Sequence, residues 1–359
     1  MNRLSKFVFA TALGLLMAGQ TFAATGGSFY TSQLSSIGTA NTSYGRTSDG
    51  LTNGYTLQEA LTNAIDLQAG DWATPPHSTA SAFTTVDQPS FMEWDLPSGT
   101  FNAKTVIAFR NSLFNFSTSS PWHLEVFNGG TWNPIGVSGA GAPSDGSIAM
   151  GNTSITNGTK IRAIYDHLNN GGSWFLTMGE ILVLPDSLQK VPNSYTATAS
   201  SQFNANNAPS MAIDNQLGNT THTWFSSTSD SNPWLTLSFT TPANIDALLL
   251  SKYDNFTGYN DAIVDIYANG TLAGGWTNGT KVAGNVDMSS PEGFASFNVF
   301  KFDTELSGVN NLSLKFIGSP RSGGGQGLEE IIPLIPEPST VGLVILAALT
   351  LVARRNQKQ

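Results

Sequence analysis

The residues best suited to acid–base or metal chemistry are the four histidines, His77, His123, His167 and His222. They are scattered along the chain, without the spacing of a metal motif and without a serine nucleophile elbow. His123 falls inside a strand-like run, where a half-buried side chain with a satisfied hydrogen bond is expected. The histidines therefore do not indicate an enzyme.

Two other stretches could be taken for chemical motifs. Glu329 and Glu330 are adjacent carboxylates, but neighbours in a strand point to opposite faces and cannot share a substrate. The run GGGQG from Gly323 lacks the Lys-Ser/Thr pair and the helix of a phosphate loop, so it is interpreted as a turn. We expect no catalysis.

Short runs of alternating apolar and polar residues dominate the chain between its two ends. They are rich in β-branched and aromatic residues and are separated by Gly, Asn, Pro and Ser, which predicts an all-β fold of antiparallel strands in sandwiches. The Asn-Gly pairs at Asn128 and Asn269 predict hairpin turns. The expected strands are SFMEWDL, TVIAFRN, HLEVFN, KIRAIYD and EILVL, then WLTLSF, IDALLLS, AIVDIYA, FNVFKFD and LSLKFIG.

Three segments recur in the same order at a nearly constant offset. ALTNAIDLQAG from Ala60 returns as APSMAIDNQLG from Ala208, WHLEVFNGGTW resembles AIVDIYANGTL, and MGEILVLP is echoed by LEEIIPLIP. The sequence thus predicts two copies of one domain, 24–186 and 190–334. A polar, proline-containing joint near DSLQKVPNS (186–194) interrupts the strand pattern between them.

Composition limits the partners. Charged residues make up 11% of the chain, the net charge is -9 and the pI is about 4.8, which argues against binding to nucleic acid. The surface is expected to be polar but mostly uncharged, which suits sugars better than phosphates. With no cysteine, the fold depends on core packing and has no disulfide or thiolate metal site.

The N-terminus has the features of a signal peptide. Arg3 and Lys6 precede an apolar run, 7–18, and Thr21, Phe22 and Ala23 supply the small-residue pattern of a cleavage site. Residues 1–23 are therefore predicted to be removed by signal peptidase during export.

The C-terminal segment, 335–359, holds Pro336, Glu337 and Pro338, an apolar run from 341 to 353, and then Arg354 and Arg355. The apolar run is short for a stable membrane helix, although an ordinary anchor remains an alternative. The arrangement resembles the PEP-CTERM sorting signal of Gram-negative bacteria, which exosortase recognises. This resemblance implies transient membrane attachment through a C-terminal hydrophobic helix, followed by delivery to the cell surface or the extracellular matrix.

Each copy resembles a discoidin domain, the coagulation factor 5/8 type C or galactose-binding-like jelly roll. The second copy carries TATASSQF, APSMAIDNQLGNTTHTWFSS, PWLTLSF and GLEEIIPL, and the first keeps AIDLQAGDW, MEWDL and GEILVL. The family usually has Gly after the Asp, where this chain has Leu67 and Asn215. It commonly has Thr at the position of His222.

The resemblance implies a structural calcium ion in each copy. It would pair Asp66 with Glu180 and Asp214 with Glu330, with backbone oxygens and Thr221 as further ligands. The alternative is that the Asp side chains cap a turn while the Glu side chains accept from nearby backbone N–H groups.

The resemblance also implies a carbohydrate site on loops at one end of each sandwich. An exported, non-catalytic protein that binds polysaccharide is therefore expected. The alternatives are a structural surface protein without a glycan ligand, or an enzyme of glycan metabolism. The expected binding residues are His167, Asn169, Asn170 and Trp174 in the first copy, and Tyr253, Asp254, Asn255, Tyr259 and Arg321 in the second.

Overall fold

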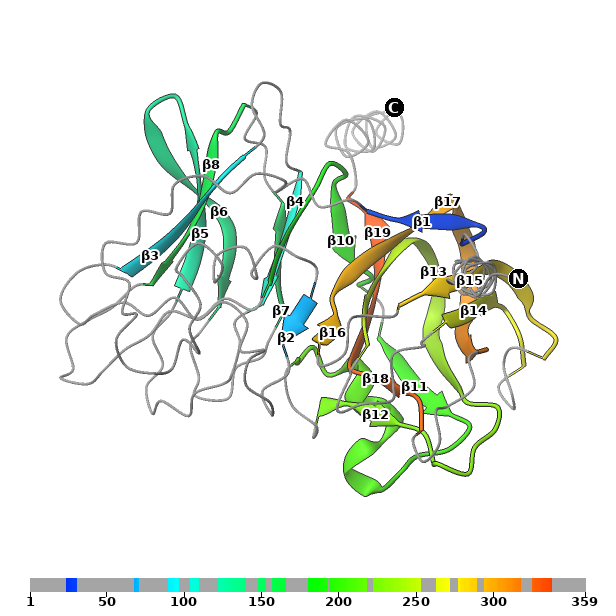
Figure 1. The fold of residues 1–359 in the computed structure, drawn as a ribbon. Helices are drawn as coiled ribbons and strands as arrows, with labels where there is room; N and C mark the ends of the chain where they lie inside the picture. The colour runs from blue at the N-terminus through cyan, green and yellow to red at the C-terminus, as the bar shows by residue number, and fades with distance from the viewer. Residues whose placement is uncertain are drawn as a thin grey trace, which may run out of the picture.

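In the computed structural model, strands make up most of the residues that the structure describes, and two lobes of β-sheet lie side by side (Figure 1). The predicted all-β class, with two sandwiches in tandem, is confirmed. Two short 3-10 helices lie between strands, η1 (Ala205–Asn207) and η2 (Pro209–Ile213). The structure describes residues 24–30, 68–70, 90–96, 104–109, 122–139, 148–152, 157–165, 180–192, 194–217, 222–252, 263–271, 277–288, 294–317 and 325–337.

The first unit stacks two antiparallel sheets, one in the order β3-β8-β5-β6 and one in the order β7-β4-β9. Along β5, Trp122, Leu124 and Val126 are buried, whereas His123 and Glu125 face outward, as the alternation of a half-buried strand requires. The strands are β3 (Ser90–Asp95), β4 (Thr105–Phe109), β5 (Trp122–Asn128), β6 (Thr131–Gly139), β7 (Ile148–Asn152), β8 (Lys160–Tyr165) and β9 (Glu180–Leu184).

The second unit is built on two long antiparallel strands, β13 (Trp234–Ser251) and β17 (Asn298–Phe316). Register shifts between Ser238 and Ala247 bend the pair, so each strand passes from one layer of the sandwich to the other. The other strands of this half are β10 (Leu188–Lys190), β11 (Tyr195–Ala199), β12 (Trp224–Phe225), β14 (Ile263–Ala268), β15 (Thr280–Asp287), β16 (Phe294–Ser296), β18 (Gly327–Leu328) and β19 (Glu330–Pro336).

The two units have the same strand order. In the first layer, the order β3-β8-β5-β6 corresponds to the start of β13, the end of β17, β14 and β15, respectively. In the second layer, the order β7-β4-β9 corresponds to the start of β17, the end of β13 and β19. Four of the strands predicted separately form two continuous strands in the structure. WLTLSF and IDALLLS both lie in β13, and FNVFKFD and LSLKFIG both extend along β17. The polar residues between them suggested breaks, but they form the bend.

The two expected hairpins differ in the structure. Gly129 and Gly130, with φ of 60° and 88°, form a two-residue turn between β5 and β6, as predicted. Asn269 also has a positive φ of 58°, but β15 begins only at Thr280, so no tight hairpin follows it. Its side-chain oxygen instead accepts from the N–H of Asn310 at 2.7 Å, which ties the turn to β17.

Three short strands connect regions far apart in the chain. β1 (Gly27–Phe29) pairs with β17, and β2 (Gln68–Gly70) pairs with β16, although the predicted division placed both segments in the first domain. β10 lies in the expected joint and pairs with β19, so the joint contains a strand. Leu188 is buried there, which explains why a polar stretch is ordered against the sheet.

A shared hydrophobic core joins the two units. Ile107, Leu182 and Leu184 of the first unit pack in one buried cluster with Leu249 and Ile332 of the second. All five residues of β9 are buried, because one face contributes to the core of the first unit and the other face contacts the second. Figure 1 shows β4, β7, β10 and β19 between the lobes, where this cluster lies.

Candidate functional site

The structure describes the residues on either side of the predicted binding loops of the second unit. Glu329 N–H donates to the Ser251 carbonyl at 2.8 Å, and Ser251 Oγ donates to the Glu329 carboxylate at 2.9 Å. On the other side, Ile317 N–H donates to the Ile263 carbonyl at 3.0 Å. Residues 253–262 and 318–324 are thus flanked by described residues that hydrogen-bond to one another.

Both pairs of flanks lie at the same end of the sandwich. Trp224 connects them, because its ring lies 5.7 Å from the Phe316 ring while its backbone pairs with Leu328, next to Glu329. The bend in β13 explains this arrangement, because it brings the end of the strand back to the same end of the sandwich as its start.

The predicted carbohydrate-binding residues themselves lie outside the described residues. They are His167, Asn169, Asn170 and Trp174 in the first copy and Tyr253, Asp254, Asn255, Tyr259 and Arg321 in the second.

Among the described residues, the large hydrophobic side chains that are exposed are Phe203 and Ile317, and both lie at this end. Phe203 is 59% exposed and Ile317 is 41% exposed. Phe203 N–H donates to the Phe225 carbonyl at 2.7 Å, which fixes the loop next to β12. The exposed residues Asn204 and Asn206 follow Phe203 in the chain, and Asn204 Oδ1 caps η1 by accepting from Asn206 N–H at 2.7 Å.

Hydrogen bonds from Ser200 and Ser201 fix the start of the loop that carries Phe203. The hydroxyls of Ser200 and Ser201 both donate to Asp230 Oδ2, and Trp224 Nε1 donates to the Ser201 carbonyl at 2.9 Å. Burial alone would raise the pKa of Asp230, but the two hydroxyl donors and the Asn232 N–H hold it below its ordinary value. The ring of Phe203 is therefore presented by a loop with fixed backbone partners.

Sequence reasoning missed Phe203 because TATASSQF was interpreted as an opening strand. In the structure the strand ends at Ala199, and the Gln-Phe-Asn segment after it forms the loop. An aromatic residue flanked by amides, directly after a strand, was the available signal.

The predicted calcium residues of the second unit meet around one turn. Asn215 N–H donates to Glu330 Oε2 at 2.7 Å, and Gln216 N–H donates to Asp214 Oδ1 at 3.0 Å. The other Asp214 oxygen lies 2.6 Å from His222 Nδ1. Asn215 has a φ of 65°, the left-handed conformation that favours Gly, so Asn serves here in place of the family's usual glycine.

Burial governs the pKa values of the two carboxyl groups at this turn. Burial raises the pKa of Glu330 well above its ordinary value, the Asp214 carboxylate raises it further, and Lys190 opposes the shift. Lys190 Nζ donates to the Asn215 side-chain oxygen. Burial also raises the pKa of Asp214, and the hydrogen bond from His222 works against this shift.

These residues do not fit a calcium site. Calcium takes six to eight oxygen ligands, yet both Asp214 oxygens and one Glu330 oxygen are engaged, and only Glu330 Oε1 among the carboxylate oxygens of the turn lacks a hydrogen bond. The part of the chain that the structure describes contains no group of three or more acidic or histidine side chains arranged around a metal position. The contacts match the alternative of a capped turn. In the first unit, Glu180 Oε1 accepts from Ile181 N–H at 3.2 Å. Asp66 of the first copy and Thr221 of the second copy lie outside the described residues.

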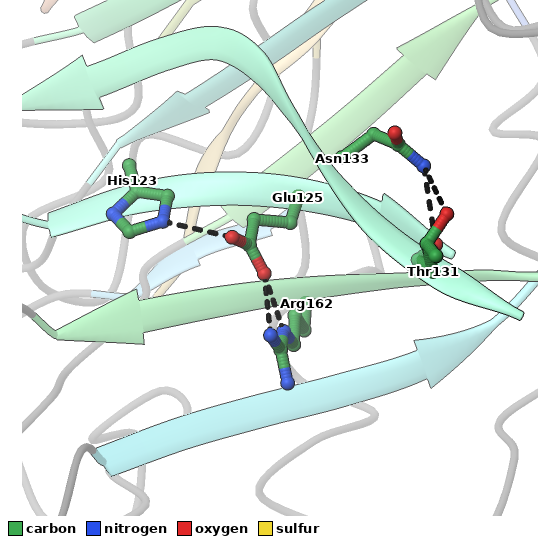
Figure 2. Close-up of polar contacts among 5 residues, drawn as sticks. All are labelled: His123, Glu125, Thr131, Asn133 and Arg162. Carbon is green, nitrogen blue, oxygen red and sulfur yellow. Dashed lines mark hydrogen bonds and ion pairs between the residues drawn. The ribbon is translucent and has the colours of Figure 1, made fainter. Parts of the chain in front are cut away.

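A polar cluster on the outer face of the first unit contains His123, the histidine that falls in a strand. Figure 2 shows Glu125 between His123 and Arg162. One Glu125 oxygen lies 3.3 Å from His123 Nε2, and the other lies 2.6 Å from Arg162 Nη2. The guanidinium lies 4.0 Å from the centre of the Trp132 ring, and Asn133 donates to the Thr131 carbonyl at 3.1 Å. Both Glu125 oxygens are engaged, so the cluster joins strands β5, β6 and β8.

Replacing Arg162 tests this structural role. Arg162→Met is expected to lower the free energy of unfolding by roughly 2 kcal/mol, because it leaves a carboxylate that is only 12% exposed without its charged donor. Urea denaturation measures the change. The double variant Glu125→Gln with Arg162→Met should recover part of the loss, and an Arg162→Met protein as stable as the wild type would contradict this role.

The predicted sorting residues divide between described and undescribed parts of the chain. Pro336 ends β19 and pairs with Leu188, and Glu337 accepts a hydrogen bond at 2.7 Å from the Ser187 hydroxyl. Pro338, Arg354 and Arg355 lie outside the described residues. Within the described ranges, the structure has no helix with the length and hydrophobicity needed to span a membrane.

The fold and this loop end define a tandem β-sandwich protein with an exposed aromatic and amide surface. No protein-family model matches the sequence, and no curated protein matches it. Among solved structures, the chain is similar to a serum F-lectin (fucolectin) of the striped bass, Morone saxatilis, at 15% identity, 86% coverage of this chain, 99% of that chain and a TM-score of 0.33.

Two Clostridium perfringens structures are also similar. The CBM32-1 and CBM32-2 domains of ZmpB are 12% identical, with coverage of 84% and 93% and a TM-score of 0.31. The family 32 carbohydrate-binding module of NanJ, solved with galactose, is 18% identical, with coverage of 41% of this chain and 99% of that chain and a TM-score of 0.32. All three TM-scores are below 0.5, so the description of the fold depends on the strand order and packing given above.

Proposed function

We propose that this protein binds carbohydrate without catalysis and that the loop end of the second sandwich holds the glycan. A pyranose can rest its flat C–H face on an aromatic ring, while a few positioned polar groups bond its hydroxyls. The exposed ring of Phe203, followed in the chain by the exposed residues Asn204 and Asn206, is the observation that carries the proposal.

The sequence-predicted loops support the same location. Tyr253 directly follows Lys252, and Arg321 falls between Ile317 and Gly325, so these segments attach to the end that presents Phe203. We propose that Tyr253, Asp254, Asn255, Tyr259 and Arg321 contribute to this site. The corresponding loop of the first copy, with His167, Asn169, Asn170 and Trp174, is proposed to form a second one.

We also propose that the protein is exported to the cell surface or matrix of a Gram-negative bacterium by signal peptidase and exosortase. Cleavage after Ala23 would leave intact both the bonds of Thr25 to Gly284 in β15 and the pairing of β1 with β17. Mass spectrometry of protein recovered from its native host tests this. A chain that retains residues 1–23 or 339–359 would contradict the corresponding processing step.

Phe203→Ala is expected to weaken glycan binding about tenfold or more, because a central aromatic side chain contributes more than ~1 kcal/mol to such an interface. The measurement is a glycan array of the full chain, followed by calorimetry with the best ligand. Stability should not change, because the side chain is 59% exposed.

Thr304→Ala is the matched control, since Thr304 is exposed at the bend of β17, away from the loop end. Binding lost in Phe203→Ala and retained in Thr304→Ala supports the proposal. A folded protein that binds no glycan indicates the structural surface protein instead. Turnover of a glycan that disappears on changing one carboxylate would indicate an enzyme.

A further inference from the structure

The turn assigned by family resemblance to calcium contacts the first unit directly. Ile148 N–H of β7 donates to the Asn215 carbonyl at 3.1 Å, and Asn215 Nδ2 donates back to the Ile148 carbonyl at 3.2 Å. A single residue of the second copy thus forms a reciprocal pair of hydrogen bonds with a strand of the first. The left-handed φ of Asn215 aims its backbone and its side chain at the same partner.

The same turn contacts the segment that connects the two copies. Lys190, the last residue of β10, donates its ammonium hydrogen to Asn215 Oδ1. Asn215 N–H in turn donates to Glu330, at the start of the last strand. Asn215 therefore bonds the first unit, the connecting strand and the closing strand of the second unit at once.

Apolar packing continues this contact. Leu217 is 1% exposed and lies in the core cluster shared by the units, with Ile148 and Leu188. The turn thus buries an apolar side chain at the boundary where its polar groups bond across it.

Side chains of the chain itself occupy the positions around this turn. His222 Nδ1 lies 2.6 Å from Asp214 Oδ2, and Lys190 Nζ donates to Asn215 Oδ1. A divalent ion bound at this turn would have to displace these contacts.

We infer that the turn from Asp214 to Leu217 is a metal-independent joint that holds the two sandwiches together through Asn215, with Lys190 and His222 bonded to the turn where a metal ion would have to enter. The turn holds this role whether or not the protein binds a glycan. Lys190 and Asn215 thereby have a role at the boundary between the units that the sequence motifs did not indicate.

The first test uses the wild-type full chain, with thermal unfolding measured in excess EDTA and in excess calcium chloride. Equal Tm values are expected. A Tm that rises with calcium or falls with EDTA would overturn the inference, because it would show that a metal ion still closes the turn.

The second test separates the side chain of Asn215 from its backbone conformation. Asn215→Gly keeps the left-handed φ accessible and retains the backbone bond from Ile148 N–H, but removes the side-chain bonds to the Ile148 carbonyl and to Lys190. Asn285→Gly is the matched control, because Asn285 also has a positive φ, of 53°, but lies in β15, outside the boundary. Protease cleavage within residues 186–194 and small-angle scattering report on the joint.

Asn215→Gly is expected to speed cleavage in the connecting segment several-fold over Asn285→Gly and to enlarge the radius of gyration. Lys190→Met should also speed cleavage in the connecting segment and enlarge the radius of gyration, to the same extent in excess EDTA as in excess calcium chloride. Equal cleavage rates in the two glycine variants would overturn the role of the Asn215 side chain, whether or not the Lys190 variant folds.

Discussion

Leu249→Ala is expected to lower the free energy of unfolding by about 3 kcal/mol, one of the largest single effects in this chain. Leu249 is fully buried in β13 and packs in the cluster that contains Leu182 and Leu184 of the first unit. Truncation leaves a cavity between two sheets, and the close-packed neighbours of both units can fill it only in part.

Because both units line this cavity, we expect them to unfold in a single transition that shifts as a whole. Differential scanning calorimetry and urea denaturation measure the shift. Ile317→Ala is the control, with an expected effect within about 0.5 kcal/mol, because Ile317 is 41% exposed at a strand end. Two separate transitions, with only one moved by Leu249→Ala, would contradict a shared core.

Gly27→Val is expected to detach β1 from the second unit and to cost about 3 kcal/mol. A Cβ atom at Gly27 would lie 2.3 Å from the Lys301 carbonyl oxygen and 2.6 Å from the Phe300 ring. Backbone cannot yield to such a contact, so β1 must leave β17 and its hydrogen bonds are lost.

Amide hydrogen exchange provides the local measurement, because Asp303 N–H donates to the Gly26 carbonyl at 3.0 Å and should exchange rapidly once β1 detaches. Ser28→Ala, at the next residue, is the control, since Ser28 is exposed and its change should leave Asp303 protected. Protection of Asp303 in the Gly27→Val protein would contradict the assignment of β1 to this sheet.

The strands were predictable because their signal is local. Alternation in WHLEVFN places Trp122, Leu124 and Val126 on one face, and the structure buries those three. The positive φ at Gly129 and Gly130 follows from residue type in the same way. Where two expected strands merged in β13, local polarity was interpreted as a break, whereas the pairing with β17 continues through bulges.

The function of the Asp214 turn was not predictable, because its meaning depends on residues that are distant in sequence. Asn215, next to Asp214, does bond Glu330, but it also bonds Lys190 and Ile148, and no local sequence pattern indicates these two contacts. Phe203 was overlooked for a related reason. An aromatic residue near a strand end can be core or surface, and only the packing around it decides which.

By itself, the sequence determined the all-β class, the alternating faces of the strands and the recurrence of one strand pattern, because period-two burial and turn chemistry act between near neighbours. Only the tertiary structure decided that β1 pairs with β17, that the two units share a core, and that Asn215 bonds across their boundary. These contacts join residues whose distance along the chain carries no local signature, so they follow from how the sheets stack.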